Sequence, residues 1–316
     1  MVGSWVFPRF DHDRKVGKTM TPSVMRTPAR TRSMGILAAA AAVAMGLAGC
    51  TSTETNDDSS LLERLQEQGS VTVGFAGEAP YSFEEGGELT GATVALHREI
   101  FGNLGIDTID GVNADFGALI PGLQANRFDV VSAGMSILPE RCEQAAFSEP
   151  EFNYTTALMV AEGNPMDLTD MQSVLDSDAR LVTMTGAIES DYASELGIDS
   201  TQVGTPQDGM DAVTSGRADV FALTAISLNW MANNNPEAPV EVTESFVAEI
   251  NGVPQVGAGG TVFRTEDQEL LAAYNEELAK ITSDPEKYLE IVGEFGFTAE
   301  ELPDPSLTTA DLCAGE

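Results

Sequence analysis

Several polar or glycine residues stand directly after segments that read as strands, where they could bind a small ligand. Ligands of α/β proteins sit beyond the carboxyl ends of strands, often between two domains. A site built there would use side chains from several strand ends at once. The residues in such positions are Glu78, Ser136, Arg141, Gly186 and Thr224.

Arg141 is the most informative of these residues because cations are rare around it. Residues 50–316 contain nine basic residues against 48 acidic ones. A planar guanidinium can hold a carboxylate through two parallel hydrogen bonds, which the ammonium of Lys cannot do. Arg141 could therefore bind a carboxylate brought by a ligand, or it could pair with a carboxylate at the surface of its own chain.

The elements that would position these residues alternate between strands and helices. We expect strands at residues 71–75, 129–134, 180–185 and 218–223. We expect helices at residues 89–104, 116–125, 169–175, 187–196, 208–215, 266–282 and 285–294. This alternation indicates parallel sheets covered by helices on both faces. Because roughly 250 ordered residues exceed the commonest domain size, two α/β lobes are favoured over one sheet.

Composition excludes several classes of function. The 316-residue chain has 16 Lys and Arg against 50 Asp and Glu, a formal net charge of −34. So acidic a chain is a poor partner for nucleic acid or an anionic membrane surface. With 42% hydrophobic and 21% charged residues, it is globular. The acidity would also suit a high-salt environment, which is a hypothesis that stability measurements against salt can test.

Motifs for cofactor chemistry are absent from the sequence. It contains no P-loop, no glycine-rich dinucleotide fingerprint and no Cys/His cluster with metal-ligand spacing, so we expect no cofactor and no metal. His12 and His97 are the only histidines. A Ser–His–Asp hydrolase would need His97 at its site, which its place on an expected helix disfavours.

The N-terminus carries the features of an export signal. Seven basic residues precede residue 50, and residues 34–47 are uncharged and rich in Ala. This apolar stretch is shorter than the ~20 residues that a membrane-spanning helix needs. We therefore predict a signal peptide at residues 1–49, with a true start possible at Met25. Without it, residues 50–316 have a net charge of −39.

The sequence LAGC at residues 47–50 resembles a bacterial lipobox. That resemblance implies cleavage before Cys50 and lipidation of this residue, which would anchor the protein to the outer face of the cytoplasmic membrane. The polar residues that follow suit a tether, so we expect a lipid-anchored linker at residues 50–64.

The segment AGMSILPER at residues 133–141, followed by FSEP at residues 147–150, resembles the polar-amino-acid group of ABC-importer solute-binding proteins, known as family 3. The resemblance covers nearly all of residues 69–300. Within the group, PERC at residues 139–142, GNP at residues 163–165 and the C-terminal LC are most similar to the ectoine/hydroxyectoine-binding branch. The resemblance implies a non-catalytic, monomeric receptor that passes a small zwitterion to an ABC permease in the membrane.

The resemblance also implies a fold, the periplasmic-binding-protein type II fold of two α/β lobes joined by two hinge crossovers. Lobe 1 would contain residues 65–155 and 255–305, and lobe 2 would contain residues 160–250, with a C-terminal tail at residues 306–316. The glycine-rich residues 257–260 would suit a hinge, or else a simple turn.

One end of the implied site binds the ligand's carboxylate. Arg141 would form the two parallel hydrogen bonds, and backbone N–H groups near Gly134 and Ser136 would hold the same carboxylate. The Ser136 hydroxyl could add a further bond. Lobe 2 would contribute Gly186 and Ala187 at a helix N-terminus, where unpaired N–H groups favour an anion.

The other end of the implied site binds a cation. Tyr81 and Phe116 match positions that stack on the ligand, and an aromatic face attracts a cation by roughly 0.5–2 kcal/mol. Glu78 could accept a hydrogen bond from a cationic nitrogen. The alternatives are core packing for Phe116 and plain solvent exposure for Glu78.

Three positions depart from the family's patterns. Amino-acid binders place an Asp where this chain has Thr224 and a Thr where it has Ala187, so a conventional α-amino acid is less favoured. The ectoine branch places a third aromatic residue where this chain has Ser136, so the pocket is mixed. We therefore favour an ectoine-like compatible solute, with a polar amino acid as the alternative.

Two further predictions concern the cysteines and catalysis. An exported protein can keep a disulfide, so Cys142 and Cys313 could join the C-terminal tail to lobe 1, or remain as two thiols. A third reading is a dehydratase-like enzyme on the same fold, for which Glu78 is the only plausible acid–base residue.

Overall fold

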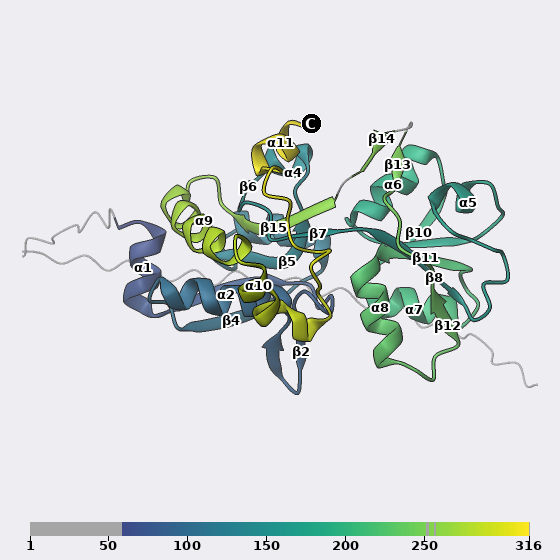
Figure 1. Ribbon diagram of the computed structural model, residues 1–316, viewed down its shortest axis with the longest axis horizontal. Coiled ribbons are helices and arrows are strands. Elements are labelled where there is room, and N and C mark those ends of the chain that lie inside the picture. Colours follow the sequence, from purple (N-terminus) through teal and green to yellow (C-terminus); the bar gives the residue numbers. More distant parts are fainter. Residues whose placement is uncertain (1–58, 251–252, 256, 316) are drawn as a thin grey trace, which may run out of the picture. The chain divides into compact units, whose positions relative to one another are not determined.

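The structure is a computed structural model that describes residues 59–250, 253–255 and 257–315 (Figure 1). The predicted signal peptide, Met25, the lipidation of Cys50 and residues 50–58 of the predicted linker lie outside the described residues. The described residues fall within one compact unit of the chain. Among them, no helix is long and apolar enough to cross a membrane.

The first of two main sheets has six strands, and it is mixed rather than wholly parallel. Strand β1 runs parallel to β4 and β5, whereas β15 runs antiparallel to its partners β5, β6 and β7. Its strands are β1 (Ser70–Phe75), β4 (Thr108–Asn113), β5 (Val130–Ser136), β6 (Ala146–Phe147), β7 (Phe152–Tyr154) and β15 (Gly257–Phe263).

Helices cover both faces of this first sheet. Val130 packs in the cluster that contains Leu96 and Ile100 of α2, whereas its neighbour Val131 packs with Leu119 of α3 on the other face. Because successive strand side chains point to opposite faces, β5 is buried on both. The elements of this lobe are α1 (Leu61–Gln68), α2 (Ala92–Asn103), the short 3-10 helix η1 (Phe116–Ala118), α3 (Leu119–Gln124), α4 (Pro139–Cys142), α9 (Gln268–Thr282), α10 (Pro285–Val292), η2 (Gly293–Phe295) and α11 (Thr309–Ala314).

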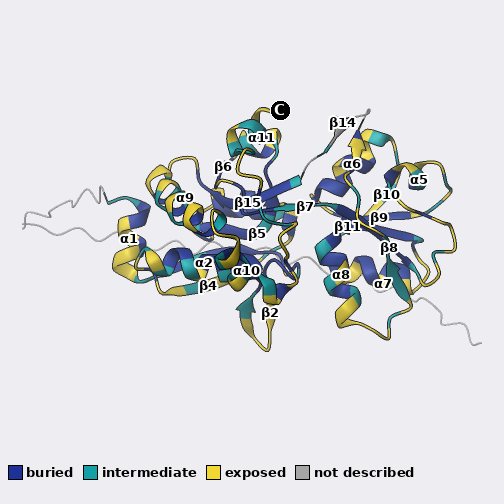
Figure 2. Cartoon of the chain, in the orientation of Figure 1, coloured by how far each residue is buried: buried dark blue, intermediate teal, exposed yellow. Residues whose placement is uncertain are grey.

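The second sheet has five strands, in the order β10-β9-β11-β8-β12. Its elements are β8 (Thr156–Ala161), α5 (Met171–Leu175), β9 (Leu181–Met184), α6 (Ile188–Leu196), β10 (Ser200–Val203), α7 (Pro206–Thr214), β11 (Val220–Thr224), α8 (Ala225–Asn234) and β12 (Val240–Val242). Two small hairpin-like pairs complete the described strands: β2 (Phe83–Glu85) with β3 (Glu88–Thr90), and β13 (Glu249–Ile250) with β14 (Val253–Pro254). Figure 2 shows that central strands of the main sheets such as β5, β8 and β11 are buried, whereas the edge strands β4, β10 and β12 are half-buried or exposed.

The predicted α/β class is confirmed, but the second sheet, like the first, is mixed rather than parallel, because β8 runs antiparallel to β11 and β12. The chain passes twice between the two sheets. The first passage is at Thr155, between β7 and β8, and the second lies between β12 and β15. This distribution of strands supports the proposed lobes at residues 65–155 with 255–305 and at residues 160–250. Residues 156–160 lie where the first predicted lobe passes into the second, and the structure places them in the buried strand β8.

The glycine-rich residues 257–260 form the start of β15 rather than a turn. Gly257 and Gly259 lack side chains at points where aromatic rings pack against the strand. A Cβ on Gly259 would lie 2.5 Å from the ring of Phe152, and one on Gly257 would overlap the ring of Tyr154. These glycines therefore admit the rings of β7 to the face of β15.

Candidate ligand-binding site

Arg141 lies in α4, the short helix that follows β5, and only 8% of the residue is exposed. Its Nη1 donates a hydrogen bond to the carbonyl oxygen of Ser136 at 3.0 Å. Its Nη2 donates to the carbonyl oxygen of Gly186 in lobe 2 at 2.8 Å. In the described part of the chain, no carboxylate forms an ion pair with this guanidinium. Arg141 is therefore a buried cation whose hydrogen-bond partners are neutral.

Phe116 and Gly186 enclose this guanidinium. The Arg141 Cζ lies 5.7 Å from the centre of the Phe116 ring, so the ring that we expected to stack on a ligand also contacts the arginine. Gly186 has φ +77°, and a Cβ there would lie 3.2 Å from the Cα of Gly117. A glycine is required at this close approach of the two lobes.

The expected backbone donors of lobe 2 are arranged differently from the prediction. Gly186 presents its carbonyl oxygen to Arg141, and the N–H of Ala187 donates to the carbonyl oxygen of Met184 at 3.1 Å. This difference arises because the Ala187 N–H forms the hydrogen bond that closes the turn between β9 and α6. The role of Gly186 and Ala187 as anion donors stays a prediction.

Glu78 reaches from lobe 1 to the start of α8 in lobe 2. Its Oε1 accepts a hydrogen bond from the Ser227 hydroxyl at 2.7 Å and another from the Thr224 hydroxyl at 3.5 Å. The residue is 4% exposed. Burial raises the pKa of Glu78 from 4.5 to about 7, although both hydrogen bonds act to lower it. Glu78 is thus a buried carboxyl group, not a solvated one.

Tyr81 belongs to the core of lobe 1. Its ring packs on those of Phe152 and Phe297, with centroids 5.2 and 5.8 Å away. Gly134, at φ +58°, makes room for this ring, because a Cβ there would lie 2.5 Å from it. Burial, and then the charge of Glu78, raise the pKa of Tyr81 well above its usual value, and its hydroxyl is buried without a hydrogen-bond partner among the described residues.

Four residues of the same region were missed by the sequence analysis: Tyr154, Thr156, Glu189 and Ser227. Glu189 lies in the first turn of α6, is fully buried, and accepts a hydrogen bond from Thr156 at 3.4 Å. Burial, followed by the charge of Glu78, raises the pKa of Glu189 to about 8. The sequence did not indicate that Glu189 is buried, because the chain has many acidic residues at its surface. One signal was available: Glu189 follows Gly186, and Ser227 follows Thr224, by three positions, which is about one helical turn.

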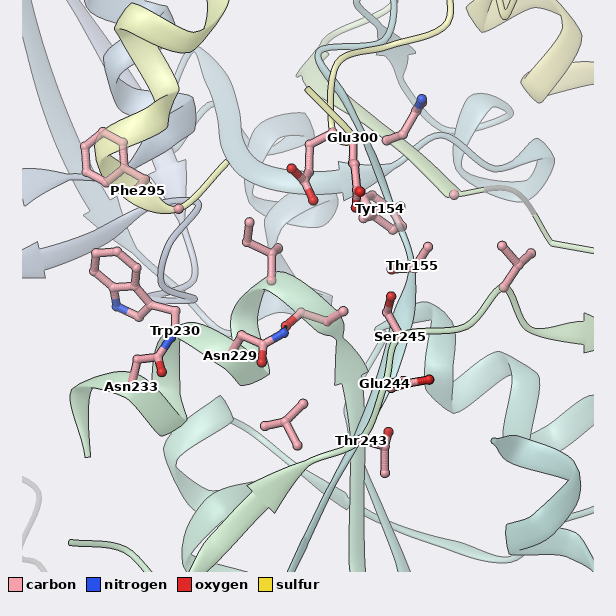
Figure 3. A pocket seen from close by; sticks show the side chains of 18 residues that line it. Tyr154, Thr155, Asn229, Trp230, Asn233, Thr243, Glu244, Ser245, Phe295 and Glu300 are labelled. Atoms are coloured by element: carbon pink, nitrogen blue, oxygen red, sulfur yellow. Dashed lines mark hydrogen bonds between the residues drawn. The ribbon is translucent and has the colours of Figure 1, made fainter. Parts of the chain in front are cut away.

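The cavity in Figure 3 lies elsewhere between the lobes and has a volume of about 580 Å³. Asn229, Trp230 and Asn233 of α8 line one side of it, and Phe295 and Glu300 line another. Tyr154 borders this cavity, but none of the nine predicted ligand-binding residues does. The cavity is therefore separate from the cluster around Arg141.

Two other predictions concern metals and the cysteines. Within the described residues, no group of three or more His, Cys, Asp or Glu side chains is placed to hold a metal ion. Cys142 of α4 and Cys313 of α11 form a disulfide in the structure, with their sulfur atoms 1.95 Å apart. This bond links the helix that carries Arg141 to the C-terminal segment.

The chain is similar in sequence and in fold to known proteins. Residues 71–295 match the family model of bacterial extracellular solute-binding proteins, family 3. A probable amino-acid ABC transporter periplasmic-binding protein of Sinorhizobium fredii is 33% identical over 261 residues, which are 80% of this chain and 86% of that protein. The lysine/arginine/ornithine-binding periplasmic protein of Escherichia coli is 26% identical over 222 residues, 65% of this chain and 79% of that one.

Among solved structures, the crystal structure of EhuB in complex with hydroxyectoine resembles this chain with a TM-score of 0.73 and 32% sequence identity. The similarity covers 81% of this chain and 98% of EhuB.

Proposed function

Because the chain belongs to the bacterial extracellular solute-binding proteins of family 3, we propose that it captures a small zwitterion of the ectoine type for an ABC importer. Membership of this family makes it a solute-binding protein with a small ligand and a membrane permease as partners. The identity of the solute, the lipid anchor on Cys50 and a monomeric state are parts of the proposal.

The observation that carries the proposal is the guanidinium of Arg141. A buried charge without a charged partner is costly, and its protein partners here are two carbonyl oxygens. A ligand carboxylate would supply the missing counter-charge through the geometry that guanidinium favours. The Phe116 ring would then lie beside that ion pair.

The other side of the site suits a delocalised cation. Glu78 is held by neutral hydroxyl groups of Thr224 and Ser227, so its charge would be available to a cationic ligand. Thr224 provides no carboxylate at the position where amino-acid binders place an Asp. The similarity to EhuB, crystallised with hydroxyectoine, supports an ectoine-like ligand with an amidinium group.

A polar amino acid is the alternative ligand of the same transport function. Ser136 occupies the position that amino-acid binders fill with Ser. The Sinorhizobium fredii relative is described as an amino-acid-binding protein, and the Escherichia coli relative as binding lysine, arginine and ornithine. An L-amino acid would use Arg141 in the same way and differ at the cationic end.

Closure around the ligand would couple binding to delivery. The bonds from Arg141 to Gly186 and from Ser227 to Glu78 join the two lobes. A ligand held by the same groups would favour the closed state, since a ligand stabilises the conformation to which it binds more tightly. The permease would then receive the loaded form at the outer face of the membrane.

A dehydratase-like enzyme is a second candidate because of the buried carboxyl group of Glu78. A pKa of about 7 suits a group that donates or accepts a proton near neutral pH. Incubating the protein with ligand and analysing the ligand after denaturation separates the two functions. Unchanged ligand supports the binding protein, whereas a converted product supports the enzyme.

Calorimetric titration tests the main proposal. Protein expressed without residues 1–49 and with Cys50→Ser, which keeps every described residue, is titrated with ectoine, hydroxyectoine, L-arginine and L-glutamine. Arg141→Ala should weaken the bound ligand at least about 30-fold, since removal of one partner from a buried charge pair costs 2 kcal/mol or more. Arg217→Ala, at an exposed arginine, is the control. Near-normal affinity of Arg141→Ala would refute the assignment.

A further inference from the structure

We infer that Glu189 is a second carboxylate of the ligand site, and that with Glu78 it selects a ligand whose positive charge is shared over two or more nitrogen atoms. An amidinium or a guanidinium group has this chemistry, whereas a single ammonium group does not. The inference rests on the proposed function, because it assigns the cationic half of the same site.

Glu189 is a buried carboxyl group with too few partners of its own. No part of the residue is exposed, and the Thr156 hydroxyl donates to Oε1 over a long distance of 3.4 Å. Its Oε2 is buried without a hydrogen-bond partner among the described residues. Buried polar atoms are nearly always hydrogen-bonded. The Oε2 of Glu151 also lacks a partner among the described residues, but its Oε1 accepts bonds from Ser148, Thr261 and Tyr274. In Glu189 both oxygens are poorly supplied, and this indicates a donor that comes from outside the chain.

Strand register places Glu189 beside Glu78. Thr156 of β8 lies directly opposite Thr224 of β11 in an antiparallel ladder. The hydroxyl of Thr156 contacts Glu189, and that of Thr224 contacts Glu78. Side chains of such a pair project from the same face with Cβ atoms about 5 Å apart. The two carboxyl groups therefore meet at one end of the second sheet, one from each lobe.

The start of α6 links Glu189 to the side of the site that holds Arg141. Gly186, whose carbonyl oxygen accepts the bond from Arg141, precedes Glu189 by three residues at the start of α6. The site thus has a guanidinium at one end and two carboxyl groups at the other. A zwitterion would place its carboxylate on Arg141 and its cation between Glu78 and Glu189.

The distribution of the ligand's charge favours a cation that donates to both carboxyl groups. An ammonium group and an amidinium group each bring one positive charge, so the net charge of the site does not distinguish them. An ammonium group carries its charge on one nitrogen atom, which would have to lie within hydrogen-bond distance of both carboxyl groups. A planar N–C–N cation presents N–H groups in two directions, so that each carboxylate can accept one.

The test compares Glu189→Gln with Glu195→Gln, an exposed acid of the same helix. Gln keeps the size of Glu and its bond with Thr156 but removes the charge. Affinities for ectoine, L-arginine and L-glutamine are measured by calorimetry, and the unfolding temperature is measured without ligand. Ectoine carries an amidinium group and L-arginine a guanidinium group, so the affinities of the unaltered protein for these two ligands show which cation it binds.

Glu189→Gln should weaken the bound amidinium or guanidinium ligand by at least about tenfold, as expected when a buried charge partner is lost, and Glu195→Gln should change it less than about twofold. The unfolding temperature without ligand should stay the same or rise, because a buried unpaired carboxyl group has been removed. A smaller loss of affinity, or an equal loss accompanied by a lower unfolding temperature, would overturn the inference. Failure of the unaltered protein to bind any of the three ligands would instead overturn the proposed function.

Discussion

Arg141 and Arg264 are two arginines with the same exposure, 8%, in very different surroundings. Arg264, just after β15, has its Nε 2.8 Å from Asp267 and its Nη2 4.0 Å from Asp129. Arg141 has hydrogen bonds to two carbonyl oxygens and no such ion pair in the described structure. Since burial is equal, the charge partner distinguishes them. Arg264 serves the fold, whereas we propose that Arg141 receives a carboxylate from outside the chain.

Two buried glutamates repeat this contrast. Glu151 in lobe 1 accepts hydrogen bonds at Oε1 from the hydroxyl of Tyr274 at 2.7 Å, and from the backbone N–H and hydroxyl of Thr261 at 3.1 and 2.5 Å. Glu189 accepts one long bond from a side chain. In both residues Oε2 has no partner among the described residues, so the difference lies at Oε1, which has several donors in Glu151 and one long bond in Glu189. The poorer supply of Glu189, together with its place between the lobes, supports the inference that it binds a ligand.

The largest expected effect concerns the covalent link beside Arg141. Replacing both Cys142 and Cys313 by Ala should lower the free energy of unfolding by up to about 5 kcal/mol, because the disulfide joins residues 171 positions apart. Affinity should change less than about threefold, since the bonds of Arg141 to Ser136 and Gly186 do not depend on the link. Urea unfolding and calorimetry measure the two quantities. Two free thiols in the denatured, unreduced protein would contradict the pairing.

The next effect tests the two arginines directly. Arg264→Ala should lower the free energy of unfolding by about 3–5 kcal/mol, because it leaves the buried carboxylate of Asp267 without its partner. Arg141→Ala should lower stability without ligand by only about 1–2 kcal/mol, since it leaves two carbonyl oxygens but no carboxylate without a partner. Ligand affinity should respond in the opposite order. Similar stability losses in both variants would remove the distinction.

A smaller effect depends on pH. The pKa of Glu78 is about 7 in the folded protein against 4.5 ordinarily, so the folded state binds the extra proton between these values. The associated stability is present below pH 4.5 and is lost as pH rises through 7, by roughly 3 kcal/mol at most. Urea unfolding from pH 5 to 8 should show this loss in the ligand-free protein and a flatter profile in Glu78→Gln. Parallel profiles would show that Glu78 is not buried in solution.

The smallest effect separates the candidate site from the cavity of Figure 3. Asn229 lines that cavity and donates to the carbonyl oxygen of Ala225 within its own helix. Asn229→Ala should change ligand affinity by less than about twofold, because the ligand would contact the cluster around Arg141 instead. A loss above about tenfold would move the ligand into the cavity.

The alternation of strands and helices could be predicted from the sequence, because it depends on local patterns, whereas the antiparallel pairing of β8 and β15 could not. The buried strand β11 is an apolar run that ends at Thr224, and in the same way β5 ends at Ser136, so polar residues stand at the ends of buried strands. The sequence could not predict the partners of the site residues. That Glu78 would meet Ser227, and Arg141 the carbonyl oxygen of Gly186, depends on how the two lobes approach each other.

Glu189 shows the same limit. One acid in a helix of an acidic chain reads as a solvent-exposed residue, whereas in the structure Glu189 is buried beside Thr156 of β8. Likewise, the glycine-rich residues 257–260 suggested a hinge or turn. In the structure, Gly257 and Gly259 lack side chains where the rings of Tyr154 and Phe152 pack against β15. Such contacts join residues far apart in the sequence.

The most direct test of the account is a double-mutant cycle between Arg141 and the carboxylate of the ligand. Calorimetry compares the unaltered protein and Arg141→Ala, each with the best-bound ligand and with its carboxamide analogue. If the guanidinium holds the carboxylate, the two changes together should cost at least about 2 kcal/mol less than the sum of their separate costs. Costs that simply add would contradict the central claim that Arg141 is reserved for the ligand.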